Sequence, residues 1–311
     1  MYAVKGMLLT LPLMQLRCKV RLSRSIQHHW QATRRYLSRI RKVNNSAQSD
    51  VHMAAKECVL ELTFLGTRGE IEARSRRHRR HSALLVEHGN ARIMIDCGLD
   101  WRGRLHAIAP TAIVLTHAHP DHAGGLAEGA PCPVYATAKT QRLLRNFPIR
   151  DRRKVWLDRT VMIGGVRFRA YRVEHSIRAP AVGYRVCAKA GTFFYLPDVA
   201  KLPNPSDALH GVSVYIGDGA TLRRSMVRKK DGVLIGHAPV TIQLEWCARA
   251  DVRRAVFTHC GSPIVRGDAR ALSRTLWRLG REHGIDACFA RDGDKMSFPD
   301  KLNVIRMLSQ T

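Results

Sequence analysis

Four side chains that commonly bind metal ions lie within one six-residue segment. The segment runs His117-Ala-His-Pro-Asp-His122 and follows residues 112–116, an apolar run typical of a buried strand. Loops anchored at the end of a rigid strand often carry function. In a tight loop, the imidazoles of His117 and His119 can converge on one ion, and Asp121 and His122 can serve a second. An isolated histidine is more often structural than a ligand, but four ligand types in this order favour a metal site.

Three further ligand-type residues follow predicted strands in the same way. His175, Asp198 and His259 each lie where a predicted strand stops. Histidine nitrogen and carboxylate oxygen suit divalent zinc, and a two-metal site needs about six or seven such ligands. One tetrahedral ion cannot use them all. The sequence therefore predicts two divalent metal ions held by His117, His119, Asp121, His122, His175, Asp198 and His259.

The composition places these residues in a globular chain. The protein has 311 residues, of which 45% are hydrophobic and 25% are charged, and this excludes collagen-like and disordered classes. Short apolar runs mix with helical periodicities, and no repeat of fixed period occurs. The pattern predicts one α/β domain over residues 56–300. Residues 1–55 are expected to be a basic, disordered N-terminal extension, and residues 301–311 a C-terminal tail.

The predicted elements place the candidate ligands at the ends of strands. A helix is expected over residues 269–283, with Asp268 as its N-cap and Gly284 as its stop. Two more helices are expected over residues 138–144 and 239–250. Strands are predicted over residues 59–65, 82–87, 91–95, 112–116, 166–173, 182–188, 192–196, 212–216, 233–235, 254–258 and 287–290.

The chain is strongly basic. It contains 52 Lys and Arg against 25 Asp and Glu, a formal net charge of +27, which favours polyanionic partners. Each of three basic runs, Arg68–Arg80, Arg142–Arg172 and Arg223–Lys230, is either a solvated face or a ligand contact. Guanidinium groups match phosphate geometry, so we expect the first run to form a loop that grips substrate phosphates. The same arginines repel a dication, which disfavours a third metal site at His78 and His81.

Cysteine usage and hydropathy bear on the compartment. The eight cysteines form no CxxC pair, so we expect reduced thiols in a cytoplasmic protein. No run approaches the roughly 18 apolar residues that span a bilayer, which predicts no membrane segment. Residues 1–49 contain ten basic and no acidic side chains. This bias is typical of a transit peptide, and equally of upstream sequence ahead of a start at Met53.

On these motifs, the sequence resembles the metallo-β-lactamase superfamily of binuclear metallohydrolases. The segment from His117 to His122 matches its HxHxDH signature, and the likeness covers about residues 57–298. The resemblance implies a four-layer αββα sandwich of the α/β class, with the metals at one edge between two sheets.

The same resemblance assigns roles to residues outside the signature. It implies that His175 and His259 are the later histidine ligands and that Asp198 is the carboxylate that bridges the metals. Asp96 matches an aspartate that orients the ligand loop. The bridging residue is Asp where the best-known lactamase subclass has Cys, which disfavours antibiotic hydrolysis.

A second segment indicates a branch of the superfamily. The Gly-His pair at His237, followed by a helix, a strand and Thr-His259, resembles the phosphodiesterase branch. That branch includes tRNA 3′-processing endonucleases and a cyclic phosphate phosphodiesterase, and its histidine matching His237 reaches the leaving group. The tRNA-processing members carry a long arm between the residues matching His175 and Asp198. Only residues 176–197 lie there in this chain, too few for an arm.

The expected function is hydrolysis of a small or cyclic phosphodiester, or of a short nucleic acid, through a metal-bound hydroxide. Asp121 is expected to orient the nucleophile, and His237 to protonate the leaving alkoxide. The two ions are expected to be zinc, with manganese or iron as alternatives, and a homodimer stays open. Two other functions remain: a thioester or lactone hydrolase of the same fold, and an inactive scaffold that binds nucleic acid.

Overall fold

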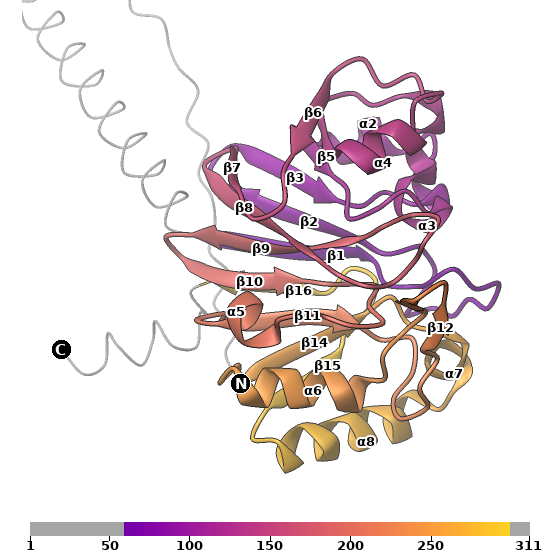
Figure 1. Cartoon of the computed structure of the whole chain (residues 1–311), viewed down its shortest axis with the longest axis vertical. Helices are drawn as coiled ribbons and strands as arrows, with labels where there is room; N and C mark the ends of the chain where they lie inside the picture. Colours follow the sequence, from indigo (N-terminus) through magenta and orange to yellow (C-terminus); the bar gives the residue numbers. More distant parts are fainter. Residues whose placement is uncertain (1–58, 299–311) are drawn as a thin grey trace, which may run out of the picture. The chain divides into compact units, whose positions relative to one another are not determined.

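Two β-sheets face each other, and helices cover the outer face of each (Figure 1). The structure is a computed structural model that describes residues 59–298. The predicted extension over residues 1–55 and the tail over residues 301–311 lie outside the described residues. The layers run helix, sheet, sheet, helix, which confirms the predicted αββα sandwich.

The first sheet has seven strands and mixes both pairing directions. In sheet order they are β16 (Lys295–Phe298), β1 (Leu60–Gly66), β2 (Ala83–His88), β3 (Ala91–Ile95), β4 (Ala112–Val114), β5 (Val134–Thr137) and β6 (Arg152–Val155). Strands β16 to β3 pair antiparallel, and β3 to β6 pair parallel. The parallel half therefore directs the ends of β3 and β4 to the same edge.

The second sheet also has seven strands, and a separate hairpin lies outside both sheets. In sheet order the strands are β15 (Asp286–Phe289), β14 (Arg254–Thr258), β11 (Val214–Asp218), β10 (Gly191–Tyr195), β9 (Val182–Ala188), β8 (Val166–Arg172) and β7 (Thr160–Ile163). Strands β10, β11, β14 and β15 pair parallel, so their carboxyl ends share one edge. The hairpin consists of β12 (Arg228–Lys230) and β13 (Val233–Ile235).

The central core lies between the two sheets. Leu62, Val86 and Ile93 of the first sheet are fully buried in one cluster with Phe168 and Val186 of the second. Alternation along the strands produces this face, because every second side chain of a strand points to the same side. The burial of these apolar side chains joins the two sheets into one unit.

The helices pack on the outer faces of the sheets. One group covers the first sheet around the buried Trp101, and a second covers the other sheet around Leu244 and Leu276. The helices are η1 (Leu99–Trp101), α2 (Leu105–Ile108), α3 (Pro120–Ala123), η2 (Gly124–Glu128), α4 (Ala138–Leu143), α5 (Pro205–Leu209), α6 (Val240–Arg249), α7 (Ser262–Arg266) and α8 (Ala269–Glu282).

The longest helix, α8, forms as its end signals predict. The Asp268 carboxylate accepts a hydrogen bond from the backbone N–H of Ala271 (2.6 Å), which confirms the predicted N-cap. Leu276 and Leu279 are buried on its inner face. After the helix, Gly284 adopts a φ of +69°, where the absence of a side chain avoids strain.

Several short strands escaped the sequence analysis. Strands β6 and β7 lie inside the basic run Arg142–Arg172 and carry mostly exposed or half-buried side chains. Both are edge strands of their sheets, and edge strands are commonly short and charged. Their apolar pattern is therefore weak. With the predicted strand β8, the run contains three strands as well as a solvated face.

No helix within residues 59–298 is long and apolar enough to cross a membrane. The six cysteines of the same residues are all free, as the sequence predicts.

Candidate metal centre

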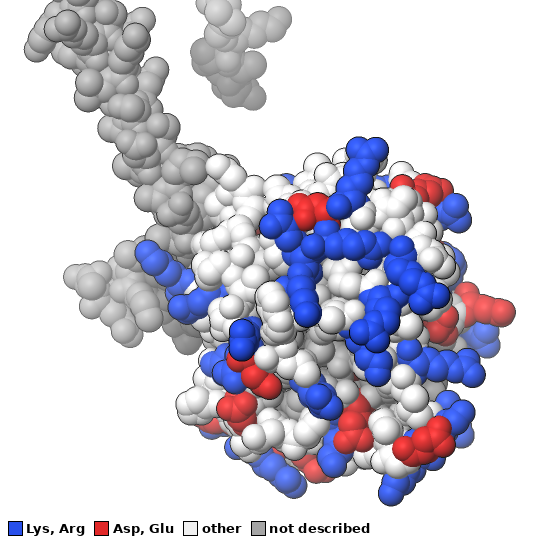
Figure 2. Space-filling model, turned by 45° about the horizontal axis from the view of Figure 1, so that its top comes forward, with Lys and Arg blue, Asp and Glu red and all other residues white. Residues whose placement is uncertain are grey.

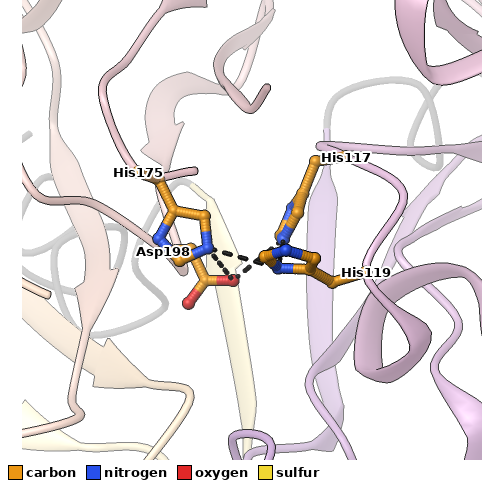
Figure 3. Close-up of side chains that lie close together, drawn as sticks. All are labelled: His117, His119, His175 and Asp198. Atoms are coloured by element: carbon orange, nitrogen blue, oxygen red, sulfur yellow. Dashed lines mark hydrogen bonds and ion pairs between the residues drawn. The ribbon is translucent and has the colours of Figure 1, made fainter. Parts of the chain in front are cut away.

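The seven predicted ligands meet at one edge between the two sheets. His117 and His119 follow β4, while His175 follows β8, Asp198 follows β10 and His259 follows β14. Asp121 and His122 lie in the short helix α3, immediately after His119. Figure 3 shows side chains from the two sheets pointing toward one another across this edge. The strands deliver the ligands, because each strand ends where the edge begins.

One group of ligand atoms surrounds a first position. His117, His119, His175 and Asp198 offer atoms that all lie within 4.8 Å of one another (Figure 3). His117 Nε2 lies 2.9 Å from His119 Nδ1 and 3.3 Å from Asp198 Oδ2. His175 Nε2 lies 3.3 Å from His119 Nδ1. Three imidazole nitrogens and one carboxylate oxygen form a ligand set suited to zinc.

A second group surrounds a neighbouring position. Asp121, His122, Asp198 and His259 also offer atoms within 4.8 Å of one another, and all four residues are buried. His259 Nε2 lies 3.0 Å from Asp121 Oδ2, and His122 Nε2 lies 3.2 Å from the same oxygen. Asp198 belongs to both groups. Its carboxylate is therefore placed between the two positions, as a bridging ligand would be.

The unsatisfied atoms of these groups test whether a metal fits. Four buried atoms have no hydrogen-bond partner within the described residues: Asp121 Oδ1, His122 Nε2, Asp198 Oδ1 and His259 Nδ1. His122 Nε2 nevertheless lies 2.7 Å from Asp198 Oδ2, and His259 Nδ1 lies 3.0 Å from Asp198 Oδ1. Short distances without hydrogen-bond angles mean that these atoms face a common point rather than one another. Divalent cations would satisfy atoms that are otherwise costly to bury, so the residues fit a metal.

Hydrogen bonds fix the orientation of several of these rings. The carboxylate of Asp96 accepts a bond from His122 Nδ1 (2.9 Å) and another from the backbone N–H of Thr116 (2.8 Å). His175 Nδ1 donates to the carbonyl of Gly236 (3.1 Å), which leaves Nε2 facing the other ligands. Such partners orient metal-binding imidazoles and fix their tautomers. The predicted orienting role of Asp96 is thus matched by its contacts.

Two of the site residues hold a strained backbone. Asp96 has a φ of +60° and His259 a φ of +52°, in the left-handed region that residues other than glycine adopt at a cost. Both lie directly after a strand, β3 and β14 respectively. Such strain persists where the surrounding structure enforces it, and it clusters at functional sites.

Burial and charge set the protonation of the histidines. Burial lowers the pKa of His117 well below its usual value and lowers the pKa of His175 to about 4. Both rings are neutral near pH 7, and the neutral ring is the form that binds a metal. Burial also acts on His122, but Asp121 and Asp198 outweigh it and raise the pKa of His122 well above its usual value. The second position is therefore electrostatically negative and attracts cations.

His237 lies beside the two groups and pairs with a residue that the sequence analysis missed. His237 Nδ1 is 2.8 Å from Asp218 Oδ2 and 3.5 Å from Asp198 Oδ1. Burial acts to lower the pKa of His237, but Asp218 outweighs it and raises the pKa to about 9. Asp218 ends β11 and is fully buried. An Asp at the end of an apolar strand was the available signal, the same one that marks Asp198.

The hairpin that precedes His237 is held against the metal cluster. The backbone N–H of Gly236 donates to the carbonyl of His175 (2.9 Å), and the N–H of Met226 donates to the carbonyl of His237 (3.1 Å). Gly236 has a φ of +99°, and a Cβ there would lie 2.2 Å from the carbonyl oxygen of Met226. Only glycine fits this close approach, so the Gly-His pair fixes the position of the His237 ring.

A cavity of about 780 Å³ opens onto the ligands, and its lining corrects one prediction. Of the run Arg68–Arg80, only Arg68's neighbours Gly69, Glu70 and Ile71 line the cavity, and none of the lining arginines comes from that run. The prediction that the arginines of Arg68–Arg80 grip substrate phosphates at this cavity is therefore wrong. The lining arginines are Arg223, Arg224 and Arg228, which belong to the run Arg223–Lys230.

Arg68 instead belongs to a buried network. Its Nη2 lies 2.6 Å from Asp100 Oδ2 and 2.8 Å from His81 Nε2. Thr67 Oγ1 donates to Asp292 Oδ1 (2.7 Å) and lies 2.8 Å from His78 Nδ1. His78 and His81 are thus engaged in structural contacts.

Comparison with known proteins agrees with this geometry. Residues 91–260, more than half of the chain, match the model of the beta-lactamase superfamily domain. Ribonuclease Z from Methanopyrus kandleri is 32% identical over an alignment of 144 residues. The match covers 41% of this chain and 50% of the relative. The chain thus spans about half the length of this curated relative.

Solved structures share the fold at low sequence identity. A diphosphatase from the PhnP family is 21% identical, with a TM-score of 0.59, and the match covers 77% of this chain and 97% of that one. The metallo-beta-lactamase fold protein YhfI from Bacillus subtilis is 14% identical, with a TM-score of 0.60 and coverage of 77% and 99%. The family match, the relative and the shared fold confirm the resemblance on which the sequence analysis relied. The chain belongs to the metallo-β-lactamase superfamily.

Proposed function

We propose that this protein is a metal-dependent hydrolase that cleaves phosphodiester bonds with two divalent ions, zinc being favoured over manganese or iron. The observation that carries the proposal is the placement of His237. It lines the cavity beside the shared ligand Asp198 and is held there by Asp218. A histidine at this place can protonate a departing oxygen, which the thiolate leaving group of a thioester needs less.

Each residue of the site has a role in this reaction. Divalent cations in the two positions would activate a water molecule and polarise a phosphoryl oxygen. Asp121 Oδ1 is buried without a hydrogen-bond partner among the described residues, so it can accept a hydrogen bond from the attacking water and orient it. His237 binds Asp218 through Nδ1, which leaves Nε2 to donate a proton to the leaving oxygen.

The size of the site favours a small or cyclic phosphodiester or a short nucleic acid. The cavity of about 780 Å³ has the dimensions of a small-molecule site. Between His175 and Asp198, the chain forms β9 and β10 of the second sheet. This interval holds no projecting arm of the kind expected for a tRNA-processing member. Similarity to a ribonuclease Z supports a nucleic-acid substrate, and the lack of an arm favours a short one.

The charge of the protein supports an anionic substrate. The net charge is +27, and Figure 2 shows a face on which Lys and Arg side chains gather, with Asp and Glu side chains mostly around them. A positive surface raises the local concentration of polyanions and speeds their association. The cytoplasmic location stays a prediction that rests on the cysteine pattern, and the homodimer stays open.

A panel of esters tests the proposal against its alternatives. Protein loaded with zinc, manganese or iron should hydrolyse bis-p-nitrophenyl phosphate faster than an aryl thioester or a γ-lactone, and chelation should abolish this activity. Preference for the thioester or the lactone would replace the phosphodiesterase with another hydrolase of the fold. Metal binding with no turnover on any ester would favour the inactive scaffold that binds nucleic acid.

A further inference from the structure

Two cavities flank the metal cluster. We call the residues Met226, Arg228 and His237, which line both cavities, the ridge between them. The first, of about 780 Å³, lies on the side of Gly69 and Leu272. The second, of about 710 Å³, lies on the side of Ser176. The site is therefore open on two sides, with the proton donor at their junction.

Each side of the ridge carries basic side chains. Arg223 and Arg224 line the first cavity, Arg178 and Lys230 line the second, and Arg228 lines both. All five residues are exposed. None of their side chains has a hydrogen bond or an ion pair within residues 59–298, whereas other surface arginines, such as Arg102 and Arg153, are paired with acids.

Few acidic groups oppose these cations. Glu70 lines the first cavity beside the ligand Asp121, and Asp231 lines the second at the hairpin turn. Apart from the candidate ligands Asp121 and Asp198 in the first cavity, three cationic side chains face one acid in each. Guanidinium and ammonium groups without protein partners, gathered at the mouth of a site, favour the binding of phosphate groups.

Two of these residues, Arg228 and Lys230, lie on the hairpin, whose backbone is held next to His237. Arg228 pairs with Ile235 across the hairpin, and the hairpin is joined to His175 through Gly236. The backbone N–H of Leu234 also donates to Glu174 Oε2 (2.9 Å). A phosphate bound at the ridge would therefore sit at a defined distance from the scissile bond.

We propose that the substrate is a linear phosphodiester that crosses the ridge and carries a second phosphate group, bound by Arg223 and Arg224 on one side or by Arg178 and Lys230 on the other. This inference rests on the proposed phosphodiesterase function and narrows its substrate class. A cyclic diester is too compact to reach both cavities. A linear chain places one ester group in each cavity, with the phosphate beyond it at a basic rim.

Thymidine dinucleotides test the inference. The rates of hydrolysis of TpT, pTpT and TpTp are compared by chromatography, since the three differ only in an added 5′ or 3′ phosphate. At least one added phosphate should raise kcat/KM by about 10–100-fold. Arg223→Ala/Arg224→Ala should abolish the gain at one end, and Arg178→Ala/Lys230→Ala the gain at the other. The ratio to TpT is taken within each variant, so partial loss of protein cancels.

A matched control and one more substrate complete the test. Arg270→Ala/Arg274→Ala, on the exposed face of α8, removes the same charge away from the cavities and should leave the ratios unchanged. The second phosphate can be a terminal monoester or a diester of an oligonucleotide backbone. A pTpT whose 5′ phosphate carries a methyl ester distinguishes the two, because that phosphate is then a diester. A retained gain indicates an oligonucleotide backbone, and a lost gain indicates a terminal phosphate.

Two results would overturn the inference. One is hydrolysis of bis-p-nitrophenyl phosphate with no gain from either added phosphate. The other is a gain that survives in both double variants. In both cases the proposed phosphodiesterase would stand. Failure to hydrolyse any diester would instead remove the proposed function itself.

Discussion

Two buried polar clusters lie near each other in this molecule and use the same residue types to different ends. The metal-centre cluster contains His122, Asp121 and Asp198, and several of its buried atoms lack hydrogen-bond partners. The Arg68 cluster contains Arg68, His81 and Asp100, whose polar groups contact one another at 2.6 to 3.0 Å. The unpaired atoms of the first cluster need bound cations as partners. In the second cluster, the Arg68 guanidinium already supplies the positive charge.

The two histidines at the centres of these clusters show the difference. Burial, together with Arg68, lowers the pKa of His81 to about 4. Carboxylates around His122 outweigh its burial and raise the pKa of that ring well above its usual value. Histidine content alone therefore does not mark a metal site. The charge that surrounds each ring decides whether a dication is attracted or repelled.

The largest expected effect follows from the shared ligand. Asp198→Ala removes a ligand from both positions, so hydrolysis of bis-p-nitrophenyl phosphate should fall at least about 10³-fold, since bound metal supplies several kcal/mol of transition-state stabilisation. Steady-state kinetics measures the loss. Asp207→Ala, an exposed aspartate in α5, is the control and should keep the original rate. A variant at position 198 with more than a tenth of the activity would refute the shared-ligand role.

The next effect separates proton transfer from metal binding. His237→Ala should slow hydrolysis of a dinucleotide by about 10²–10⁴-fold, because an alkoxide leaving group needs a proton. Bis-p-nitrophenyl phosphate should suffer much less, since p-nitrophenolate leaves without help. Metal content, measured by elemental analysis, should not change. Equal losses on both substrates, together with lost metal, would make His237 a ligand or a structural support.

The Arg68 cluster should respond in stability instead. Arg68→Met removes the buried guanidinium that contacts Asp100, whose side chain is 14% exposed, and should lower the free energy of unfolding by about 1.5–3 kcal/mol. Arg74 binds the same carboxylate at 3.0 Å but is 56% exposed, so Arg74→Met should cost less than about 1 kcal/mol. Urea denaturation measures both variants. Similar losses for the two would contradict the buried role of Arg68.

A smaller effect is expected at Asp218, which positions His237. Asp218→Asn removes the charge but keeps the shape, and losses of about 10–100-fold are typical of such supporting contacts. The loss should appear in kcat for the dinucleotide more than in KM. It should again be small for the p-nitrophenyl ester. A loss independent of the leaving group would indicate a structural role for Asp218.

The clustering of the strand-end residues could be predicted from the sequence, because each is recognised from the few residues that precede it in the chain. An apolar run followed at once by a ligand-type residue is visible at His117, Asp198 and His259, and the structure brings these side chains together. Asp218 follows the same rule, but Gly residues lie on either side of it, and such a segment is also typical of a turn. Its contact with His237 is long-range, and the pattern alone does not reveal it.

The basic runs could not be interpreted from sequence for a related reason. Arg68 and Arg74 look equivalent in the run Arg68–Arg80, yet Arg68 is 1% exposed because Asp100 lies across from it. Strands β6 and β7 were missed because the charged residues of edge strands obscure their alternation. In both cases the deciding partner is distant in the chain.

The central claim is that the metal-centre cluster binds two metal ions and that the Arg68 cluster binds none. Metal stoichiometry tests this claim most directly. Protein purified without chelator and saturated with zinc should contain two equivalents per chain by elemental analysis, and His81→Gln should leave that number unchanged. Asp198→Ala should contain fewer than one. A saturated value of one equivalent, unchanged in Asp198→Ala, would contradict a two-metal centre built around this carboxylate.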